Sequence, residues 1–191
     1  MVTKILVFDN YDSFTYNLVH LVEKILHVKV DVFRNDEITL DAIKKYDKII
    51  LSPGPGIPEE AGLLIPLIKE YANSKSILGV CLGHQAIALS FGGTLINLDT
   101  VYHGVATSIK ILAKQSKLFA GLSPGELVGR YHSWIVSAKD LPADLEITAT
   151  DENNYIMGLQ HKKFDVQGVQ FHPESVLTPC GETIIRNWLK G

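Results

Sequence analysis

A cysteine between two glycines is the residue of this chain best suited to covalent chemistry. Cys81 lies in the run Gly79-Val80-Cys81-Leu82-Gly83-His84-Gln85, directly after an apolar stretch. A strand that ends in glycine-x-nucleophile-x-glycine and turns at once into a helix is a nucleophile elbow. The glycines permit the sharp turn, and the start of a helix favours the thiolate form of a cysteine. We therefore interpret Cys81 as a catalytic thiol rather than as an inert buried cysteine.

A nucleophilic cysteine needs a base, and the base needs a group that orients it. The segment Val169-Gln170-Phe171-His172-Pro173-Glu174 offers both, at the end of a strand expected over 166–171. Residues two apart in an extended stretch point the same way, so we expect the Glu174 carboxylate to approach His172 and to select the tautomer of its ring. Pro173 ends the strand because it has no N–H donor. The predicted triad is Cys81, His172 and Glu174.

A stiff loop, Ser52-Pro53-Gly54-Pro55-Gly56-Ile57-Pro58, follows another short apolar strand. Taken alone, it is better explained as a rigid connector between two elements. Acyl transfer to a thiol, however, requires N–H donors for the oxyanion of the tetrahedral intermediate. Gly54 and Gly56 can bring their backbone N–H groups close to a substrate without obstruction by a side chain.

The motifs SPGPG, GVCLGHQ and FHPE, in this order, resemble those of the class I, triad-type glutamine amidotransferases. The resemblance extends from Lys4 to Leu189. The opening run from Ile5 to Asn17, and Gly129-Arg130-Tyr131-His132-Ser133 further on, are similar to the branch that serves chorismate-using enzymes. That branch contains the small subunits of anthranilate synthase (component II) and of aminodeoxychorismate synthase.

The resemblance implies a role for each site residue. Cys81 would attack the side-chain amide of L-glutamine, His172 would act as base and then as acid, and Glu174 would orient it. Ammonia would leave, and water would release glutamate from a γ-glutamyl thioester. The backbone N–H groups of Gly54 and Leu82 would form the oxyanion hole. The implied glutamine-binding positions are Gly54, Pro55, Gly56, Gln85, Ser133 and Trp134.

The resemblance also implies a partner, a large chorismate-binding synthase subunit that receives the ammonia in a hetero-oligomer. The segments 175–181 and 187–189 resemble anthranilate synthase more, which favours tryptophan biosynthesis; the alternative is aminodeoxychorismate synthase, in folate biosynthesis. The chain departs from the branch at Trp134, which is commonly Leu, and at Val105-Ala106, where a basic residue is missing. We expect the segment 102–106 to form part of the partner interface.

Three other classes of protein fit the sequence less well. A stand-alone cysteine hydrolase would keep the elbow, but FHPE and Gln85 argue against it. A non-catalytic scaffold subunit would tolerate loss of the triad, which is intact in this sequence. An amidotransferase that acts on nucleotides is usually fused to a long synthetase domain, for which 191 residues leave no room.

The composition of the chain narrows its class further. With 191 residues, 46% of them apolar, we expect one amidotransferase domain over 1–191. The 18 basic and 21 acidic residues nearly balance, which argues against a nucleic-acid partner. Met1 to Lys4 leads into a strand rather than a signal peptide, and no apolar run is long enough for a membrane. Two cysteines, one needed as a thiol, favour the cytoplasm, and no spacing indicates a metal or another cofactor.

Apolar strands that alternate with amphipathic helices predict an α/β fold: a mostly parallel, open, flavodoxin-like sheet flanked by helices. After Gly92-Gly93 the pattern changes to strands and hairpins, so we expect an added antiparallel region in the C-terminal half. The expected parallel strands are 5–8, 28–33, 49–51 and 76–80, and the antiparallel ones are 94–98, 107–112, 126–129, 146–150, 155–161 and 166–171. Helices are expected from Asp12 or Ser13, over 40–46 and 64–71, after the elbow, and from Pro179 onward.

Overall fold

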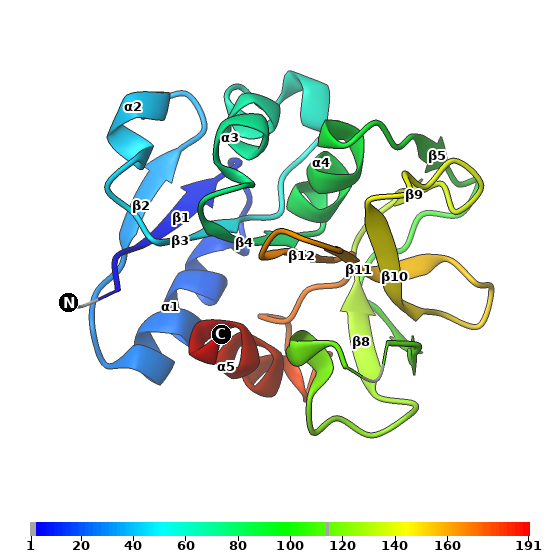
Figure 1. The fold of residues 1–191 in the computed structure, drawn as a ribbon. Helices are drawn as coiled ribbons and strands as arrows, with labels where there is room; N and C mark the ends of the chain where they lie inside the picture. The colour runs from blue at the N-terminus through cyan, green and yellow to red at the C-terminus, as the bar shows by residue number, and fades with distance from the viewer. Residues whose placement is uncertain (1–2, 114) are drawn as a thin grey trace.

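The computed structural model describes residues 3–113 and 115–191. Its centre is an eight-stranded sheet with the order β2-β1-β3-β4-β12-β11-β10-β7 (Figure 1). The first five strands in this order are parallel, and the last three alternate in direction. In the same order the strands are Asp31–Arg34, Ile5–Asp9, Lys48–Leu51, Ser76–Val80, Val166–Val169, Ile156–His161, Leu145–Thr150 and Lys110–Ile111. The expected fold class, a mostly parallel sheet with an antiparallel C-terminal region, is confirmed.

Helices cover both faces of the sheet. Figure 1 shows α3 (Leu64–Tyr71) and α4 (Leu82–Ser90) on one face, and α1 (Thr15–Leu26) and α5 (Gly181–Lys190) on the other. The short helix α2 (Leu40–Ile43) packs beside α3. Two antiparallel pairs lie outside the main sheet: β5 (Leu95–Asn97) with β9 (Trp134–Val136), and β6 (Val105–Ser108) with β8 (Leu127–Arg130).

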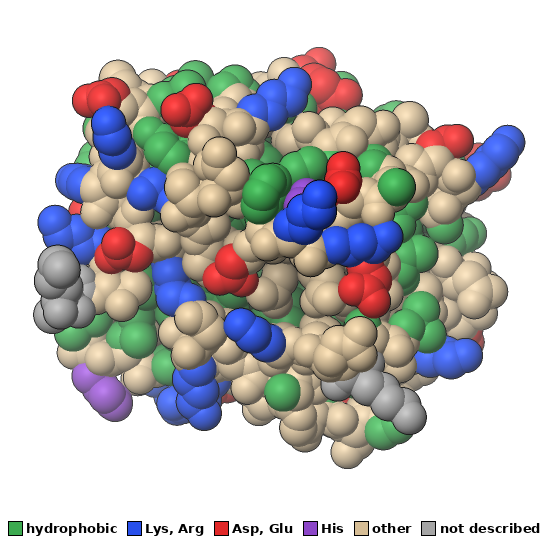
Figure 2. Space-filling view, in the orientation of Figure 1, with side chains coloured by type: hydrophobic (Ala, Val, Ile, Leu, Met, Phe, Trp, Pro, Cys, Tyr) green, Lys and Arg blue, Asp and Glu red, His purple; other side chains and the backbone are tan. Residues whose placement is uncertain are grey.

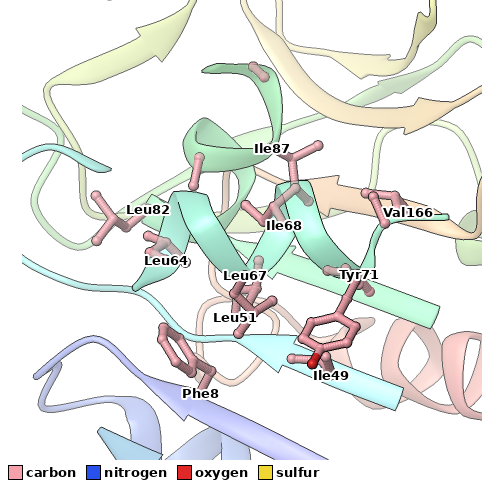
Figure 3. Close-up of a cluster of buried hydrophobic side chains, with 14 of the residues drawn as sticks. Phe8, Ile49, Leu51, Leu64, Leu67, Ile68, Tyr71, Leu82, Ile87 and Val166 are labelled. Carbon is pink, nitrogen blue, oxygen red and sulfur yellow. The ribbon is translucent and has the colours of Figure 1, made fainter. Parts of the chain in front are cut away.

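The inner parallel strands β1, β3 and β4 are mostly apolar because both of their faces are covered. Successive side chains point to opposite faces, so Ile49 and Leu51 of β3 join the cluster under α3 and α4, whereas Ile50 joins the cluster under α1 and α5. Figure 3 shows Leu64, Leu67 and other side chains of α3 pointing toward these strands. Each fully buried side chain of this size stabilises the fold by roughly 1.5–3 kcal/mol.

Several expected boundaries were wrong. The helix whose N-cap was expected at Asp12 or Ser13 begins at Thr15 with Phe14 as its N-cap, because the Asp12 carboxylate instead accepts the Phe14 N–H in a turn before it. The strand expected over 28–33 is β2, at Asp31–Arg34. Strand β9 was not foreseen, since its three residues carry no readable alternation.

The largest correction concerns the last strand. Residues 166–169 were assigned to the antiparallel region, yet β12 pairs in parallel with β4 and in antiparallel fashion with β11. β12 is therefore the strand where the two regions of the sheet join. Its hairpin with β11 is local, whereas its pairing with β4 spans some ninety residues of sequence and leaves no local signal.

Lys and Arg side chains are interspersed with Asp and Glu on the face seen in Figure 2. Within the described part of the chain, the search for a helix long and apolar enough to cross a membrane found none. Met1 and Val2, on which the expectation about a signal peptide partly depends, lie outside the described residues.

Candidate active site

The turn between β4 and α4 holds Cys81 in a strained conformation. Its φ of 52° and ψ of −99° place a non-glycine residue in a region that L-amino acids rarely adopt. A Cβ atom on Gly79 would lie 2.5 Å from the backbone of Gly83, and one on Gly83 would lie 2.6 Å from the carbonyl oxygen of Leu51. The two glycines therefore let the helix approach the strands closely enough to form the elbow. Leu82 joins the buried cluster of Figure 3 and fixes the start of α4 to the core.

His172 and Glu174 form a buried pair. The Nδ1 atom of His172 lies 2.7 Å from Oε1 of Glu174, and the two side chains are 2% and 0% exposed. They approach each other in a turn, in which the Ser175 N–H donates to the His172 carbonyl, and not along an extended strand as expected. The turn is held in place because the backbone of His172 also bonds to Gly129 of β8 and to the Thr178 hydroxyl.

The surroundings of His172 favour its charged form. Burial opposes the imidazolium, but the Cys81 sulfur and the Glu174 carboxylate outweigh it and hold the pKa of His172 well above its usual value. The Nε2 atom of His172 has no hydrogen-bond partner among the described residues. Phe14 and Tyr131 pack edge-on against the ring, with centroids 5.5 and 4.9 Å away. The ring can therefore exchange a proton at Nε2 while Nδ1 stays bonded to Glu174.

A cavity of about 200 Å³ opens over Cys81. Its lining includes all of the expected oxyanion and glutamine-binding positions, together with residues that the sequence did not single out for binding. The lining residues are Gly54, Pro55, Gly56, Cys81, Leu82, Gln85, Val101, Tyr102, His103, Tyr131, His132, Ser133 and Trp134. His172 and Glu174 are not among them; the His172 ring interacts with the Cys81 sulfur, and Glu174 lies against its Nδ1 atom.

Two backbone donors at this cavity have no acceptor. Neither the Gly54 N–H nor the Leu82 N–H donates a hydrogen bond within the described residues. A Cβ on Gly54 would lie 2.6 Å from Leu82 Cδ2 and 2.7 Å from Asn10, so the loop packs directly against the elbow. Asn10 holds the loop through two hydrogen bonds to Ser52, of 2.8 and 2.9 Å. The opening motif, whose role the sequence left open, thus supports the loop.

The side-chain amide nitrogen of Gln85 makes its hydrogen bonds within the protein. Its Nε2 atom donates to the Trp134 carbonyl at 2.9 Å and to Gln170 Oε1 at 3.2 Å. Both hydrogens of the amide are therefore used, and only its oxygen is left to accept a bond from a ligand. The Trp134 carbonyl also lies 3.0 Å from His132 Nδ1, so its two lone pairs are engaged within the protein.

Gln170 is a residue at the site that the sequence reasoning missed. Its Nε2 atom lies 3.6 Å from Cys81 Sγ, and its side chain is fully buried. The motif that contains His172 includes this glutamine, but it was considered only as a strand residue. The signal that could have found it is a polar side chain at the end of a buried strand.

A buried ion pair supports the far wall of the cavity. Arg130 Nη1 lies 2.7 Å from Asp151 Oδ2, and Arg130 Nε donates to His132 Nε2 at 3.2 Å. The Arg130 guanidinium stacks on Tyr102, 3.5 Å from the ring centroid. Burial and the Arg130 charge lower the pKa of His132 to about 3, so this ring stays neutral and accepts the bond.

The amino-acid sequence that forms this site matches the model of a known family. The family model described as glutamine amidotransferase class-I matches residues 6–191. The chain belongs to the class I glutamine amidotransferases. It is thus an enzyme of that family, and the elbow, the cavity and the His–Glu pair described above lie within the matched residues.

Curated relatives of this amidotransferase carry two kinds of name. It is 47% identical to an anthranilate synthase component 2 from Cyanophora paradoxa, over 97% of each chain. It is 42% identical to an aminodeoxychorismate/anthranilate synthase component 2 from Bacillus subtilis, over 97% of this chain and 95% of that protein. A bifunctional protein TrpGD from Thermotoga maritima is 44% identical, and the match covers 97% of this chain but only 32% of that longer protein.

A solved structure bears on the argument from chain length. A protein from Thermoplasma acidophilum, provisionally described as one of the subunits of GMP synthase, superimposes with a TM-score of 0.87 at 28% identity, over 100% of this amidotransferase and 94% of that chain. A separate chain of similar length thus carries a nucleotide-related description. Chain length is therefore no argument against the nucleotide class, and the chorismate branch depends on the motifs and on the names of the relatives.

Two other residues were left without a role by the sequence. His84 of α4 is fully buried beside Gly168, and burial lowers its pKa to about 4. Cys180, at the start of α5, is a buried free cysteine, and burial raises the pKa of its thiol to about 11. Among the described residues, no cluster of three or more His, Cys, Asp or Glu is arranged to hold a metal.

Proposed function

We propose that this chain is the glutaminase subunit of a chorismate-using synthase and that Cys81, His172 and Glu174 are its catalytic triad. The observation that carries the proposal is the elbow itself. A strained cysteine lies beside two backbone donors that have no acceptor among the described residues, and the ring of a buried His–Glu pair interacts with its sulfur. These are the parts that acyl transfer to a thiol requires.

The chemistry follows from the geometry. His172 takes the proton of the Cys81 thiol, and the sulfur attacks the carboxamide carbon of L-glutamine. The oxyanion that forms accepts from the N–H groups of Gly54 and Leu82. His172 then gives its proton to the departing nitrogen, the C–N bond breaks, and ammonia leaves a γ-glutamyl thioester. A water molecule, deprotonated by His172, hydrolyses the thioester and releases glutamate. Glu174 stabilises the imidazolium form of His172 in both steps.

The binding positions divide between walls of the cavity. Gly54, Pro55 and Gly56 come from the loop after β3, and Ser133 and Trp134 come from the segment between β8 and β9. We propose that Gln85 Oε1 accepts a hydrogen bond from the α-ammonium group of glutamine, since its two N–H donors are engaged. A Gln85→Met variant is therefore expected to raise KM more than it lowers kcat.

The partner is a large chorismate-binding subunit, with which the chain forms a hetero-oligomer and to which it delivers ammonia. Anthranilate synthase is the first choice, which places the chain in tryptophan biosynthesis. The double name of the Bacillus subtilis relative supports aminodeoxychorismate synthase as the second candidate. Such a chain is expected to be a weak glutaminase by itself and to be stimulated by its partner, since ammonia released without an acceptor is lost.

The test is a glutaminase assay of the purified chain, alone and with each of the two large subunits plus chorismate. Stimulation of glutamine hydrolysis and formation of anthranilate, or of aminodeoxychorismate, would identify the partner. The activity of a stand-alone hydrolase would not change when either large subunit is added. Hydrolysis that is stimulated only by a nucleotide-binding synthetase would refute the chorismate assignment.

A further inference from the structure

We infer that Gln170 is a positioning residue for the nucleophile: its side-chain amide donates a hydrogen bond to Cys81 Sγ and holds the sulfur ready for attack. The inference rests on the proposed role of Cys81 as the nucleophile. The donor nitrogen lies 3.6 Å from the sulfur, a distance suited to a hydrogen bond to the large sulfur atom. Gln170 is fully buried, so water does not compete for either atom of its amide.

The orientation of the Gln170 amide follows from its neighbours. The Trp134 carbonyl only accepts hydrogen bonds, so the Gln85 atom that lies 2.9 Å from it is the nitrogen. The same nitrogen lies 3.2 Å from Gln170, whose facing atom must therefore be the oxygen. The nitrogen of Gln170 is then the atom that faces Cys81. One carbonyl thus determines the direction of both amides in the row Trp134–Gln85–Gln170–Cys81.

The backbone places Gln170 beside the sulfur with little freedom. Gln170 directly follows β12 and Cys81 directly follows β4, and these strands pair in parallel with Val169 opposite Val80. The Cys81 N–H donates to the Val169 carbonyl at 2.9 Å, and the Gln170 N–H donates to the Met157 carbonyl at 3.0 Å. Donor and acceptor are therefore carried by neighbouring strands of one buried sheet.

The contact serves the chemistry in two ways. A donor to sulfur stabilises the thiolate more than the thiol, because a hydrogen bond to a charged atom is stronger than one to a neutral atom. It also directs one sulfur lone pair toward Gln170, which limits the orientations of the sulfur. Gln170 is not among the residues that line the cavity, so it acts on the nucleophile and not on glutamine.

The test measures the reactivity of Cys81 directly. Gln170→Met keeps the length of the side chain and removes the donor, and Gln170→Asn keeps an amide that is one carbon too short to reach. Alkylation of Cys81 by iodoacetamide, quantified by mass spectrometry across pH, is expected to slow about tenfold at neutral pH in both variants. The midpoint of the alkylation profile is expected to move to higher pH. Cys180 in the same molecule, whose thiol pKa is raised to about 11 by burial, is expected to stay unreactive in all variants.

Gln167→Met is the matched control. Gln167 is a buried glutamine of β12, the strand that Gln170 follows, but its Nε2 atom donates to Asp165. The alkylation profile of Cys81 in this variant is expected to equal that of the wild type. Gln85→Met is expected to slow alkylation less than Gln170→Met, and the double variant no more than Gln170→Met alone, because Gln85 acts through Gln170.

Glutamine hydrolysis, measured with the partner subunit, supplies the second readout. Gln170→Met is expected to lower kcat about tenfold and to leave KM nearly unchanged, since the residue does not contact the substrate. An alkylation profile of Gln170→Met and Gln170→Asn equal to that of the wild type would overturn the inference. If the wild type does not hydrolyse glutamine at all, the proposed function fails, whereas the alkylation profiles still decide the role of Gln170.

Discussion

The parallel and the C-terminal parts of this molecule are held together by different means. Strands β1, β3 and β4 are buried on both faces by apolar side chains, and the elbow that follows β4 depends on close contact at glycines. The C-terminal part buries charge instead, in the pairs Arg130–Asp151 and His172–Glu174. Apolar burial has no direction, whereas hydrogen-bonded groups require defined angles. The parallel part therefore provides a rigid support for Cys81, and the C-terminal part directs the groups that act on the sulfur.

The largest effect is expected at Cys81, the proposed nucleophile and the one member of the proposed triad in the parallel part. Cys81→Ser should lower glutamine hydrolysis by about 10³-fold or more, because an unactivated hydroxyl is a far poorer nucleophile than a thiolate. The change is nearly isosteric, so the thermal unfolding midpoint should stay close to that of the wild type. Mass spectrometry of the wild type with glutamine should find the γ-glutamyl adduct on Cys81. An adduct on Cys180, or full activity of the variant, would refute the mechanism.

The triad members of the C-terminal part should differ from each other. His172→Ala should cost nearly as much activity as the loss of Cys81, since the residues act as a unit. Glu174→Gln should cost less, about 10- to 100-fold, because the amide still holds the ring but stabilises the imidazolium poorly. Steady-state kinetics of both variants measure the difference. Normal hydrolysis by both variants would show that another residue is the base.

The stability of the C-terminal part should depend on its buried charge. Arg130→Met leaves the Asp151 carboxylate without its cation and should lower the free energy of unfolding by about 3 kcal/mol. The control is Lys24→Met, which removes the exposed partner of Glu182 and should change little. Urea unfolding of both variants tests the contrast. Equal effects would show that the buried pair contributes no more than a surface pair.

Acid should also weaken the C-terminal part first. Burial lowers the pKa of folded His132 to about 3, against 6.5 in the unfolded chain, so between these values the unfolded state binds more protons. Stability that is present above pH 6.5 is therefore lost as the pH falls toward 3, by up to about 1.4 kcal/mol for each pKa unit. His132→Gln should reduce this loss in urea unfolding at pH 7 and pH 4.5. If the variant loses as much stability in acid as the wild type, the loss arises from other groups, such as the buried His84.

The smallest effect is expected at the surface beside the cavity. Tyr102 and His103 line the cavity, and the neighbouring Val105 is 41% exposed. If the segment 102–106 contacts the synthase subunit, Val105→Asp should weaken association about tenfold by burying an unpaired charge, and should leave basal hydrolysis unchanged. The matched control is Val28→Asp, which alters a valine that is 48% exposed between α1 and β2. Equal affinities of the two variants in titration calorimetry would exclude this segment from the interface.

The sequence by itself determined the elements whose signals are local. Helix α3 and strand β4 have the expected bounds, Leu64–Tyr71 and Ser76–Val80, because an apolar helical stripe and a short apolar run depend only on nearby residues. The spacing of glycines around Cys81 predicted the sharp turn for the same reason. The motifs also named the residues that the fold brings to one cavity, although their roles remain a prediction.

Only the tertiary structure decided how the two parts of the molecule meet. Strand β12 lies beside β4 through a pairing between segments some ninety residues apart, which no local pattern encodes. That pairing places Gln170 against Cys81, and a turn, not an extended strand, joins His172 to Glu174. The direction of each buried amide follows from a carbonyl on another strand. Such contacts depend on partners at fixed distances and angles, which exist only once the whole sheet has formed.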